Sequence, residues 1–396
     1  MTLFGGLGLA LALAACATSD EANRREDTPT IVLDAAASDG TDGGLLDAGA
    51  DAGCAASDPT CVTTPITCEE ASWCPVQTTM SSLYALTAVW GSDKDDVWAS
   101  GSGGTVIHWD GAAWTPTPLP TVTGLPLKNT FHALWGSGRN DVWVASTTDT
   151  IFHTDGFKNG NATWTRLPNA VQAVPVPVYA AWGTKPDDLR FGGRPFQFAG
   201  PDELFVANQI VKHDSGAGVE WTGARGTATI YGFWGSSPDD LWLIGDNRAT
   251  LAWQLGLTMR GTRRGDDFVW TEIDSRASVV LRGIWGSSAS DVWTVGDQGT
   301  IRRFGPKATE WEIIASPTTE TLHAVWGAAA NDVWAVGESG TILHWDGAEW
   351  TASVAAFPAH QKKPHLYGVW GSGPTDVWIV GEGIALRFTG KTGGSK

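Results

Sequence analysis

The dipeptide Trp-Gly occurs seven times in this chain, and the residue three positions before it differs from copy to copy. The residues at this position are Thr87, His132, Tyr179, Tyr231, Arg282, His323 and Tyr367. Their hydroxyl, imidazole, phenol and guanidinium groups can stack on a ligand or exchange hydrogen bonds with it. They are therefore our candidate ligand rim.

Four carboxylates follow in the last four copies, in the loop between the second and third expected strands. They are Asp246, Asp297, Glu338 and Glu382. In the fold inferred below these loops lie near the start of the inner strands, so we expect an acidic arc beside the rim. The alternative, in which the acids are only solvated around a water-filled channel, stays open.

Motifs of known catalytic chemistry are missing from the sequence. It contains no Gly-rich phosphate loop, no nucleophile elbow and no HExxH segment. His108, His153 and His344 stand at one repeated third-strand position, which favours packing over metal binding. The sequence therefore predicts a protein that is not an enzyme and that uses no metal and no cofactor.

A sequence repeat positions all of these side chains. The tryptophans of the Trp-Gly pairs are Trp90, Trp135, Trp182, Trp234, Trp285, Trp326 and Trp370. They stand 41 to 52 residues apart, and an Asp follows each of them six positions later. Because all seven copies carry this Asp, we expect it to cap the turn between the first two strands rather than to do chemistry.

Each copy contains four short runs typical of strands. The sixth copy reads "LHAVWG", "VWAVG", "TILHWDG" and "AEWTASV", with Asp346-Gly347 as its strongest hairpin signal. Four strands in a period of about 45 residues are typical of a β-propeller blade. The sequence predicts an all-β, seven-bladed propeller of four-stranded antiparallel blades, with most of the 23 tryptophans filling the space between blades.

The seventh copy shows no fourth strand after "GIALRFTGKTGG". One tryptophan, Trp73, lies upstream of the first copy, in the segment "SWCPVQTT" from Ser72 to Thr79. We expect this segment to supply the missing strand and to close the ring. Closure would remove the free sheet edges that otherwise pair with other chains.

The first residues resemble the export signal of a bacterial lipoprotein. The apolar run Leu3 to Ala15 is too short to span a bilayer and has the length of a signal-peptide core. It ends in Leu13-Ala14-Ala15-Cys16, which resembles a lipobox. The resemblance implies lipidation of Cys16 and, with Ala17 next, an outer-membrane location. The alternative is a buried apolar helix.

The following stretch is strongly acidic. Thr18 to Pro75 carries 12 Asp and Glu residues but only Arg24 and Arg25, in a chain of net charge −17. Such a tract buries too little apolar surface to fold, so we expect a disordered tether from Ala17 to about Asp58. The expected division is a signal peptide (1–15), a lipidated Cys and acidic linker (16–71), the propeller (72–390) and a tail (391–396). The sequence offers no basic face, so we expect no binding to nucleic acid.

Four further cysteines lie close together at Cys54, Cys61, Cys68 and Cys74. In an exported chain an even set of cysteines indicates disulfides, here with three possible connectivities. A zinc site of four thiolates is the alternative. Its ligands normally come as pairs two residues apart, which these spacings do not provide.

The repeats resemble those of bacterial neuraminidase repeat (BNR) propellers and of photosystem II assembly-factor-like propellers. In both families "G-T-I" and then "D-G-x-x-W" mark the third strand, the hairpin and the outer strand. Here these motifs are Gly340–Ile342 with Asp346–Trp350, and Gly104–Val106 with Asp110–Trp114. The resemblance implies a propeller over about Ser72 to Gly390.

We expect a monomeric, non-catalytic binding or assembly platform for a protein partner at the bacterial cell envelope, touching the membrane only through its lipid. Two alternatives stay open. One is a lectin-like propeller that binds glycans on exposed aromatic rings. The other is a sialidase-like glycoside hydrolase, which would need clustered arginines and a Tyr nucleophile.

Two insertions interrupt the repeat. The third copy is extended from Arg194 to Asn208, with no strand register that the pattern can fix. In the fourth copy "TMRGTRRGDD" predicts a long hairpin on the opposite face. Its arginines, Arg260, Arg263 and Arg264, are candidates to dock an anionic partner.

Overall fold

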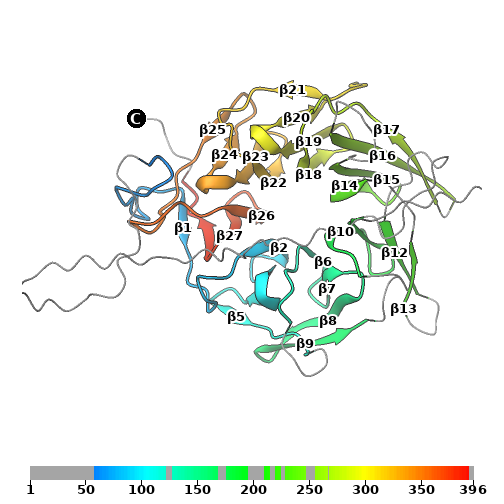
Figure 1. Cartoon of the computed structure of the whole chain (residues 1–396), viewed down its shortest axis with the longest axis horizontal. Coiled ribbons are helices and arrows are strands. Elements are labelled where there is room, and N and C mark those ends of the chain that lie inside the picture. Colours follow the sequence, from blue (N-terminus) through cyan, green and yellow to red (C-terminus); the bar gives the residue numbers. More distant parts are fainter. Residues whose placement is uncertain are drawn as a thin grey trace, which may run out of the picture. The chain divides into compact units, whose positions relative to one another are not determined.

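A computed structural model of the chain describes residues 58–121, 127–167, 175–194, 209–214, 219–223, 228–246, 255–265 and 267–391. In these residues the strands form seven antiparallel sheets of four strands each, arranged as a ring (Figure 1). The predicted seven-bladed propeller is therefore confirmed. The expected signal peptide, lipidated Cys16 and most of the tether lie outside the described residues, in which no helix has the length and apolar character needed to cross a bilayer.

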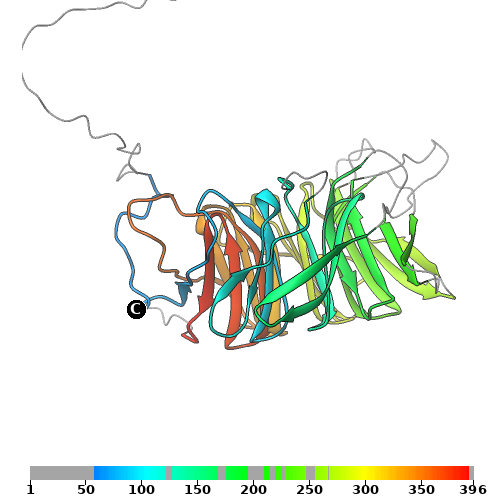
Figure 2. The same ribbon diagram turned by 90° about the horizontal axis from the view of Figure 1, so that it is seen from below.

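Four strands recur in the same order in each blade. The inner strands are β2 (Leu86–Asp93), β6 (Ala133–Gly138), β10 (Val178–Gly183), β14 (Thr229–Ser237), β18 (Leu281–Ser288), β22 (Leu322–Ala329) and β26 (Leu366–Gly373). The second strands are β3 (Asp96–Gly101), β7 (Asp141–Thr147), β11 (Leu189–Gly193), β15 (Asp240–Asp246), β19 (Asp291–Gly296), β23 (Asp332–Gly337) and β27 (Asp376–Gly381). Seen from the side, the strands of neighbouring blades stand next to one another (Figure 2).

The outer half of each blade is more variable. The third strands are β4 (Val106–Trp109), β8 (Thr150–Lys158), β12 (Gln209–Asp214), β16 (Gly256–Arg264), β20 (Ile301–Phe304), β24 (Ile342–Trp345) and β28 (Ile384–Phe388). The outer strands are β5 (Trp114–Pro116), β9 (Asn161–Arg166), β13 (Val219–Gly223), β17 (Asp267–Glu272), β21 (Glu312–Ile314), β25 (Trp350–Ala352) and β1 (Trp73–Pro75). Three short 3-10 turns, η1 (Ser102–Gly104), η2 (Asp297–Gly299) and η3 (Glu338–Gly340), link second to third strands.

Tryptophans join neighbouring blades by edge-to-face contacts. In six blades the second-strand Trp meets the outer-strand Trp of the next blade, with ring centroids 4.9 to 6.2 Å apart and planes at 75 to 89°. The pairs are Trp98–Trp164, Trp143–Trp221, Trp242–Trp311, Trp293–Trp350, Trp334–Trp73 and Trp378–Trp114. Each such contact stabilises by roughly 0.5–1.5 kcal/mol beyond its buried area.

The blade that lacks a second-strand Trp keeps the same contact in another form. Arg190 stands there, and its guanidinium lies 4.6 Å from the centre of the Phe268 ring in the next blade. A planar cation thus replaces the indole over an aromatic face.

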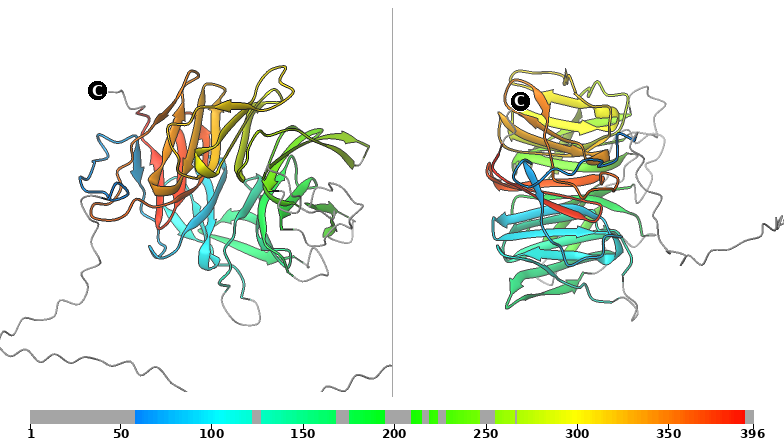
Figure 3. Two further views of the ribbon diagram at one scale, coloured as in Figure 1. Left: turned by 45° about the horizontal axis from the view of Figure 1, so that its top comes forward. Right: turned by 90° about the vertical axis from the view of Figure 1, so that its left-hand side faces the viewer.

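Trp73 completes the ring of contacts. Strand β1 pairs antiparallel with β28, with Trp73 opposite Phe388, and lies beside the last blade in the tilted view of Figure 3. The fully buried Trp73 ring packs edge-on against Trp334 and donates from Nε1 to Ser353 Oγ at 3.1 Å. The upstream segment therefore supplies the fourth strand of the seventh blade, as the sequence predicts.

The Trp-Gly pairs explain why glycine follows tryptophan. A Cβ placed on this glycine would lie only 2.3 to 2.8 Å from the indole of the preceding blade, so no other residue leaves room for the ring. The contacts run around the whole circle, from Trp90 on Gly136 to Trp370 on Gly91.

The repeated Asp holds the turn between the first and second strands. In six blades it accepts a hydrogen bond from a Ser or Thr four residues earlier, at 2.5 to 2.8 Å. It also binds a cationic or imidazole side chain: His108, His153, Arg190, Arg260, Arg303, His344 or Arg387. The histidines at the repeated third-strand position are therefore partners of this Asp.

The predicted long hairpin is present as β16 and β17, but its arginines are not all available to a partner. Arg260 Nε donates to Asp240 at 2.6 Å, and Arg263 Nε donates to the Pro238 carbonyl and lies 3.1 Å from Asp239. Arg264 is the exposed one of the three, and among the described residues its side chain makes no hydrogen bond or ion pair. Local carboxylates bind the other two guanidinium groups, and docking of an anionic partner by this hairpin stays a prediction.

The third blade gains a defined register, with Arg190 opposite Val211 where β11 pairs β12. The predicted insertion from Arg194 to Asn208 lies outside the described residues except for Arg194.

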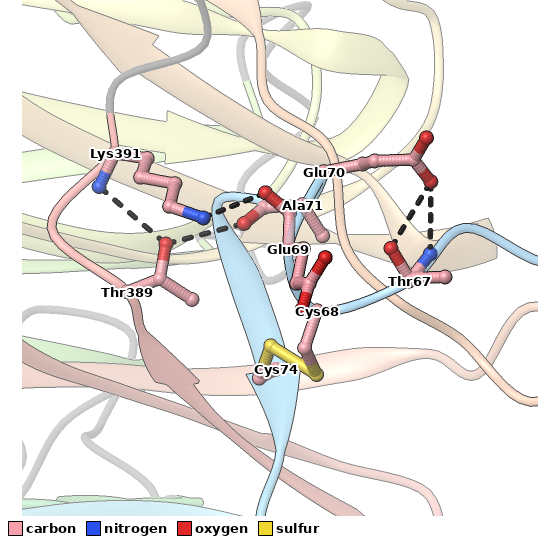
Figure 4. The surroundings of a disulfide bond; sticks show 8 residues. All are labelled: Thr67, Cys68, Glu69, Glu70, Ala71, Cys74, Thr389 and Lys391. Carbon is pink, nitrogen blue, oxygen red and sulfur yellow. Dashed lines mark hydrogen bonds between the residues drawn. A yellow bond between two sulfur atoms is a disulfide. The ribbon is translucent and has the colours of Figure 1, made fainter.

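A disulfide joins Cys68 and Cys74 next to β1 (Figure 4). Cys61 is disulfide-bonded as well, whereas the fourth candidate, Cys54, lies outside the described residues. The zinc alternative is therefore wrong for these cysteines. Around the disulfide, Lys391 Nζ donates to the Glu69 carbonyl at 2.6 Å and Thr389 Oγ1 to that of Ala71 at 3.1 Å, so these two residues after β28 are tied to the segment that closes the ring.

Candidate binding site at the centre of the ring

All seven predicted rim residues line one cavity of about 440 Å³. Ala85, Ser102 and Thr130 complete its wall. Positions spread over 280 residues of sequence are brought together because each stands at the start of an inner strand. The cavity lies within the range of roughly 300–1,000 Å³ that is usual for small-ligand sites.

A β-bulge presents the rim side chain in six blades. The register of the inner strand shifts at Thr87, Tyr179, Tyr231, Arg282, His323 and Tyr367. A bulged residue has no partner opposite it, so its side chain can be re-aimed without disturbing the rest of the strand. His132 stands just before its strand β6 instead.

The residues around each bulge hold it in place. The preceding residue is apolar and buried, as at Leu86, Leu281, Leu322 and Leu366. Opposite the bulge, most second strands end in a glycine that leaves room for a backbone carbonyl: a Cβ on Gly337 would lie 2.0 Å from the Thr321 oxygen. The packing is therefore the same in blade after blade, while the rim side chain is free to vary.

The four predicted acids stand 15 residues after the rim residue of their own blade and contact it. Tyr367 Oη donates to Glu382 at 3.1 Å, and Tyr231 Oη to Asp246 at 3.4 Å. Arg282 donates twice to Asp297, from Nε and, at 3.2 Å, from Nη2. His323 Nε2 lies 3.8 Å from Glu338 Oε1.

The four acids lie beside the rim residues but outside the wall of the central cavity. None of the four acids lines the central cavity, and Asp246 is 3% exposed. They lie behind the rim because the backbone N–H of the acid bonds to the carbonyl two residues before the rim residue, as from Glu382 to His365 at 3.0 Å. Asp246 is therefore shielded from solvent, whereas Glu382 is exposed.

Aromatic rings follow one another around part of the cavity. His132 lies 5.5 Å from Tyr179, and Tyr179 lies 5.4 Å from Tyr231. The Arg282 guanidinium lies 5.8 Å from the centre of the Tyr231 ring. On the other side His323 and Tyr367 are 5.0 Å apart. The wall is therefore largely aromatic.

Burial sets the protonation of these groups. It lowers the pKa of His323 to about 4, helped by the charges of Arg282 and His365, and it also lowers the pKa of His132. Burial and the Glu382 carboxylate raise the pKa of Tyr367 to about 12. At neutral pH His323 is therefore uncharged, and Tyr367 keeps the proton that it donates, which makes this phenol a poor nucleophile.

A second cavity of about 460 Å³, which we call the groove, adjoins this site. Its wall includes Val76, Met80, Lys362 and Glu382. Ser82 lines the groove and Ala85 lines the central cavity, and between these two in the sequence stand Leu83, which is 91% exposed, and Tyr84, which is 43% exposed.

Sequence reasoning missed several parts of this site. Ser102 and Thr130 line the cavity without any repeated signal, and the groove arises from loops that are not consecutive in sequence. The spacing of 15 between rim residue and acid was visible in the sequence and would have predicted the pairing. No group of three or more His, Cys, Asp and Glu side chains poised for a metal occurs in the described part of the chain.

Comparison with known proteins adds fold similarity. No family model matches the chain, and no curated protein matches its sequence. A solved structure described as YCF48 bound to D1 peptide matches 83% of this chain and 99% of its own, with a TM-score of 0.59 at 17% identity. YCF48 from Cyanidioschyzon merolae matches 80% of this chain and 98% of its own, with a TM-score of 0.58 at 18% identity.

The WD40 β-propeller domain of Doa1 is also similar, with a TM-score of 0.55 at 11% identity over 80% of this chain and 96% of its own. Identities this low show the fold and no more, because propellers host many unrelated functions. The fold implied by the repeat motifs is therefore supported, and the function has to be argued from the site.

Proposed function

We propose that this chain is a non-catalytic binding platform whose propeller holds a segment of a partner protein across the central cavity. The observation that carries the proposal is that the seven positions at which the blades differ line a single cavity. Residues kept alike in all blades serve the fold, whereas these seven give the cavity its own chemistry.

Two further observations support a protein partner. The exposed Leu83 and half-exposed Tyr84 join a residue of the groove, Ser82, to a residue of the central cavity, Ala85, and they offer apolar surface to an extended segment that reaches from one to the other. The structure with the same fold described as YCF48 bound to D1 peptide shows that a propeller of this kind binds a peptide. That ligand belongs to YCF48 and is not carried over to this chain.

The proposal includes the location of the platform. We infer that Cys16 carries a lipid that holds the monomeric protein at the bacterial cell envelope, on the outer membrane, as the lipobox-like Leu13-Ala14-Ala15-Cys16 indicates. Replacing Cys16 with Ser is expected to abolish incorporation of labelled palmitate and to release the protein from the membrane fraction. Unchanged labelling would refute the anchor.

The binding proposal is tested by capture from envelope extracts with three forms of the full-length chain. Tyr231→Ala with Tyr367→Ala alters the cavity, and Arg264→Ser is the matched control on the long hairpin. We expect the wild-type chain and the control to capture a partner protein and the cavity variant to fail to capture it. A peptide with the sequence of the partner's binding segment should compete with the partner for the wild-type chain.

Other outcomes would assign another function. Binding to a glycan array that depends on Tyr231 and Tyr367 would show a lectin. Hydrolysis of an aryl glycoside that is abolished by Arg282→Ala would show a glycoside hydrolase. A partner captured equally by all three forms would contradict the proposed site.

A further inference from the structure

We propose that the central cavity recognises the side-chain ammonium group of a lysine on the partner segment. This inference rests on the proposed function and adds the chemical group that the cavity selects. Four features of the wall carry it.

The first feature is the aromatic lining. Three tyrosines and two histidines face the cavity, and the electron-rich face of an aromatic ring attracts a cation within about 6 Å. The protein already contains one such contact, since the Arg282 guanidinium lies over Tyr231. A second cation finds further rings at Tyr179 and Tyr367.

The second feature is the carboxylate behind Tyr367. The phenol donates its proton to Glu382 at 3.1 Å, and this bond polarises the ring toward greater negative charge. Glu382 itself is exposed and also accepts from the backbone N–H of His365 at 3.1 Å. Both contacts fix a negative charge close to the cavity.

The third feature is the unmet hydrogen-bonding capacity of His323. Its Nε2 is buried and has no hydrogen-bond partner within the described ranges, since Glu338 is 3.8 Å away. Unlike the buried indole nitrogens of the blades, this one belongs to a residue that lines the central cavity, where a ligand can supply the partner. With the proton on Nδ1, Nε2 accepts a hydrogen bond from an ammonium group, and Glu338 lies just beyond.

The fourth feature is the neutralised arginine. Arg282 is the sole arginine among the seven rim residues, and both of its hydrogen bonds recorded here go to Asp297. An anionic ligand would have to displace Asp297 and to approach Glu338 and Glu382. The charge distribution therefore opposes anions and favours a cation.

The test uses the full-length chain labelled with ¹⁵N in its histidines and a probe that reproduces the end of a lysine, n-butylammonium chloride. At pH 7 we expect the His132 and His323 signals to shift and saturate, while His108, buried at the repeated Asp contact, stays unchanged. Sodium butyrate and N-acetylglucosamine at the same concentrations should leave all three signals in place.

Variants link the shift to the proposed charges. Glu338→Gln with Glu382→Gln is expected to weaken butylammonium binding about tenfold, because two nearby charges are removed without a change of shape. Glu349→Gln, on the exposed turn beside Gly347, is the control and should bind as wild type. If the double variant does not fold, the single change Tyr367→Phe is expected to weaken binding about threefold.

The inference is overturned if butyrate or the sugar shifts His323 as strongly as the amine does, or if the charge-removing variants titrate like wild type. Its failure is separable from that of the proposed function. A captured partner segment that depends on the cavity but contains no lysine would refute only the inference. Amine binding without any cavity-dependent partner would refute only the proposed function.

Discussion

Five inner strands carry a bulge near both of their ends, whereas β10 has only the upper one and β6 only the lower one. The two bulges differ in what they present. The lower bulge, next to the repeated Asp, places a serine in five blades, and that serine donates to the Asp. The upper bulge presents four residue types in six blades, with tyrosine in three of them, and all six residues line the central cavity. One backbone device therefore serves the fold at one end and a site at the other.

The difference teaches how a repeat protein separates stability from recognition. At the lower end each side chain has its partner within the same blade, so seven equivalent contacts add up. At the upper end the backbone is equally fixed, but the side chains differ, and among the described residues the buried Nε2 of His323 has no hydrogen-bond partner. Substitutions at the two ends should accordingly affect different measurements.

The largest expected effect is at the lower end. Asp96 and His108 are 1% and 2% exposed and 2.8 Å apart, and Ser92 donates to the same carboxylate. Asp96→Ala leaves the buried imidazole of His108 without its acceptor and also removes the acceptor of the Ser92 hydroxyl, so we expect the free energy of unfolding to fall by about 3–5 kcal/mol. Asp332→Ala, where the side chain is 23% exposed and no serine donates, should cost only about 1 kcal/mol.

Urea unfolding of the full-length chain, followed by tryptophan fluorescence, measures both changes. Equal losses in the two variants would show that burial does not decide the strength of the contact.

The second prediction separates the two ends by pH. The pKa of His323 is about 4 in the folded protein against the ordinary 6.5, so the unfolded chain binds the proton first as the pH falls. The stability that depends on neutral His323 is therefore fully present above pH 6.5. It is lost as the pH falls from 6.5 to 4, by about 3 kcal/mol at most. His323→Gln should flatten this part of the stability curve.

The lower end responds in a more acidic window. Burial alone would raise the pKa of Asp141, but hydrogen bonds from His153, Ser137 and Trp143 lower it to about 2. Its contribution is therefore present above pH 3.8 and is lost between 3.8 and 2, by about 2 kcal/mol. A single transition window that both His323→Gln and Asp141→Asn alter alike would contradict the separation.

The third prediction concerns the circle of Trp-Gly contacts. A Cβ on Gly327 would lie 2.7 Å from the Trp285 ring and 2.8 Å from the Asp332 carbonyl, so Gly327→Ala should cost about 2 kcal/mol. Gly373→Ala is the matched control, because nothing lies within 4 Å of its Cβ position. Thermal unfolding compares the two, and equal midpoints would show that the ring yields to the extra methyl group.

Most of the fold could be predicted from the sequence, since its signals are periodic. Seven Trp-Gly pairs gave the number of blades, and the unassigned Trp73 indicated the closing strand. The site was predicted in part, because the rim residues are defined by their place in the repeat. The burial of Asp246 and the binding of Arg263 were not predictable, because they depend on contacts between segments whose separation is not repeated.

The smallest effect compares one hydroxyl at each bulge. Ser287→Ala removes a donor from Asp291, whose side chain is 7% exposed, and should cost about 1 kcal/mol. Tyr367→Phe removes a donor from Glu382, which is exposed and regains water, so its cost should be a few tenths of a kcal/mol. For butylammonium binding the order reverses, since only Tyr367 faces the cavity. If Ser287→Ala weakened binding as much as Tyr367→Phe, the two ends of the strand would be coupled and stability could not vary independently of recognition.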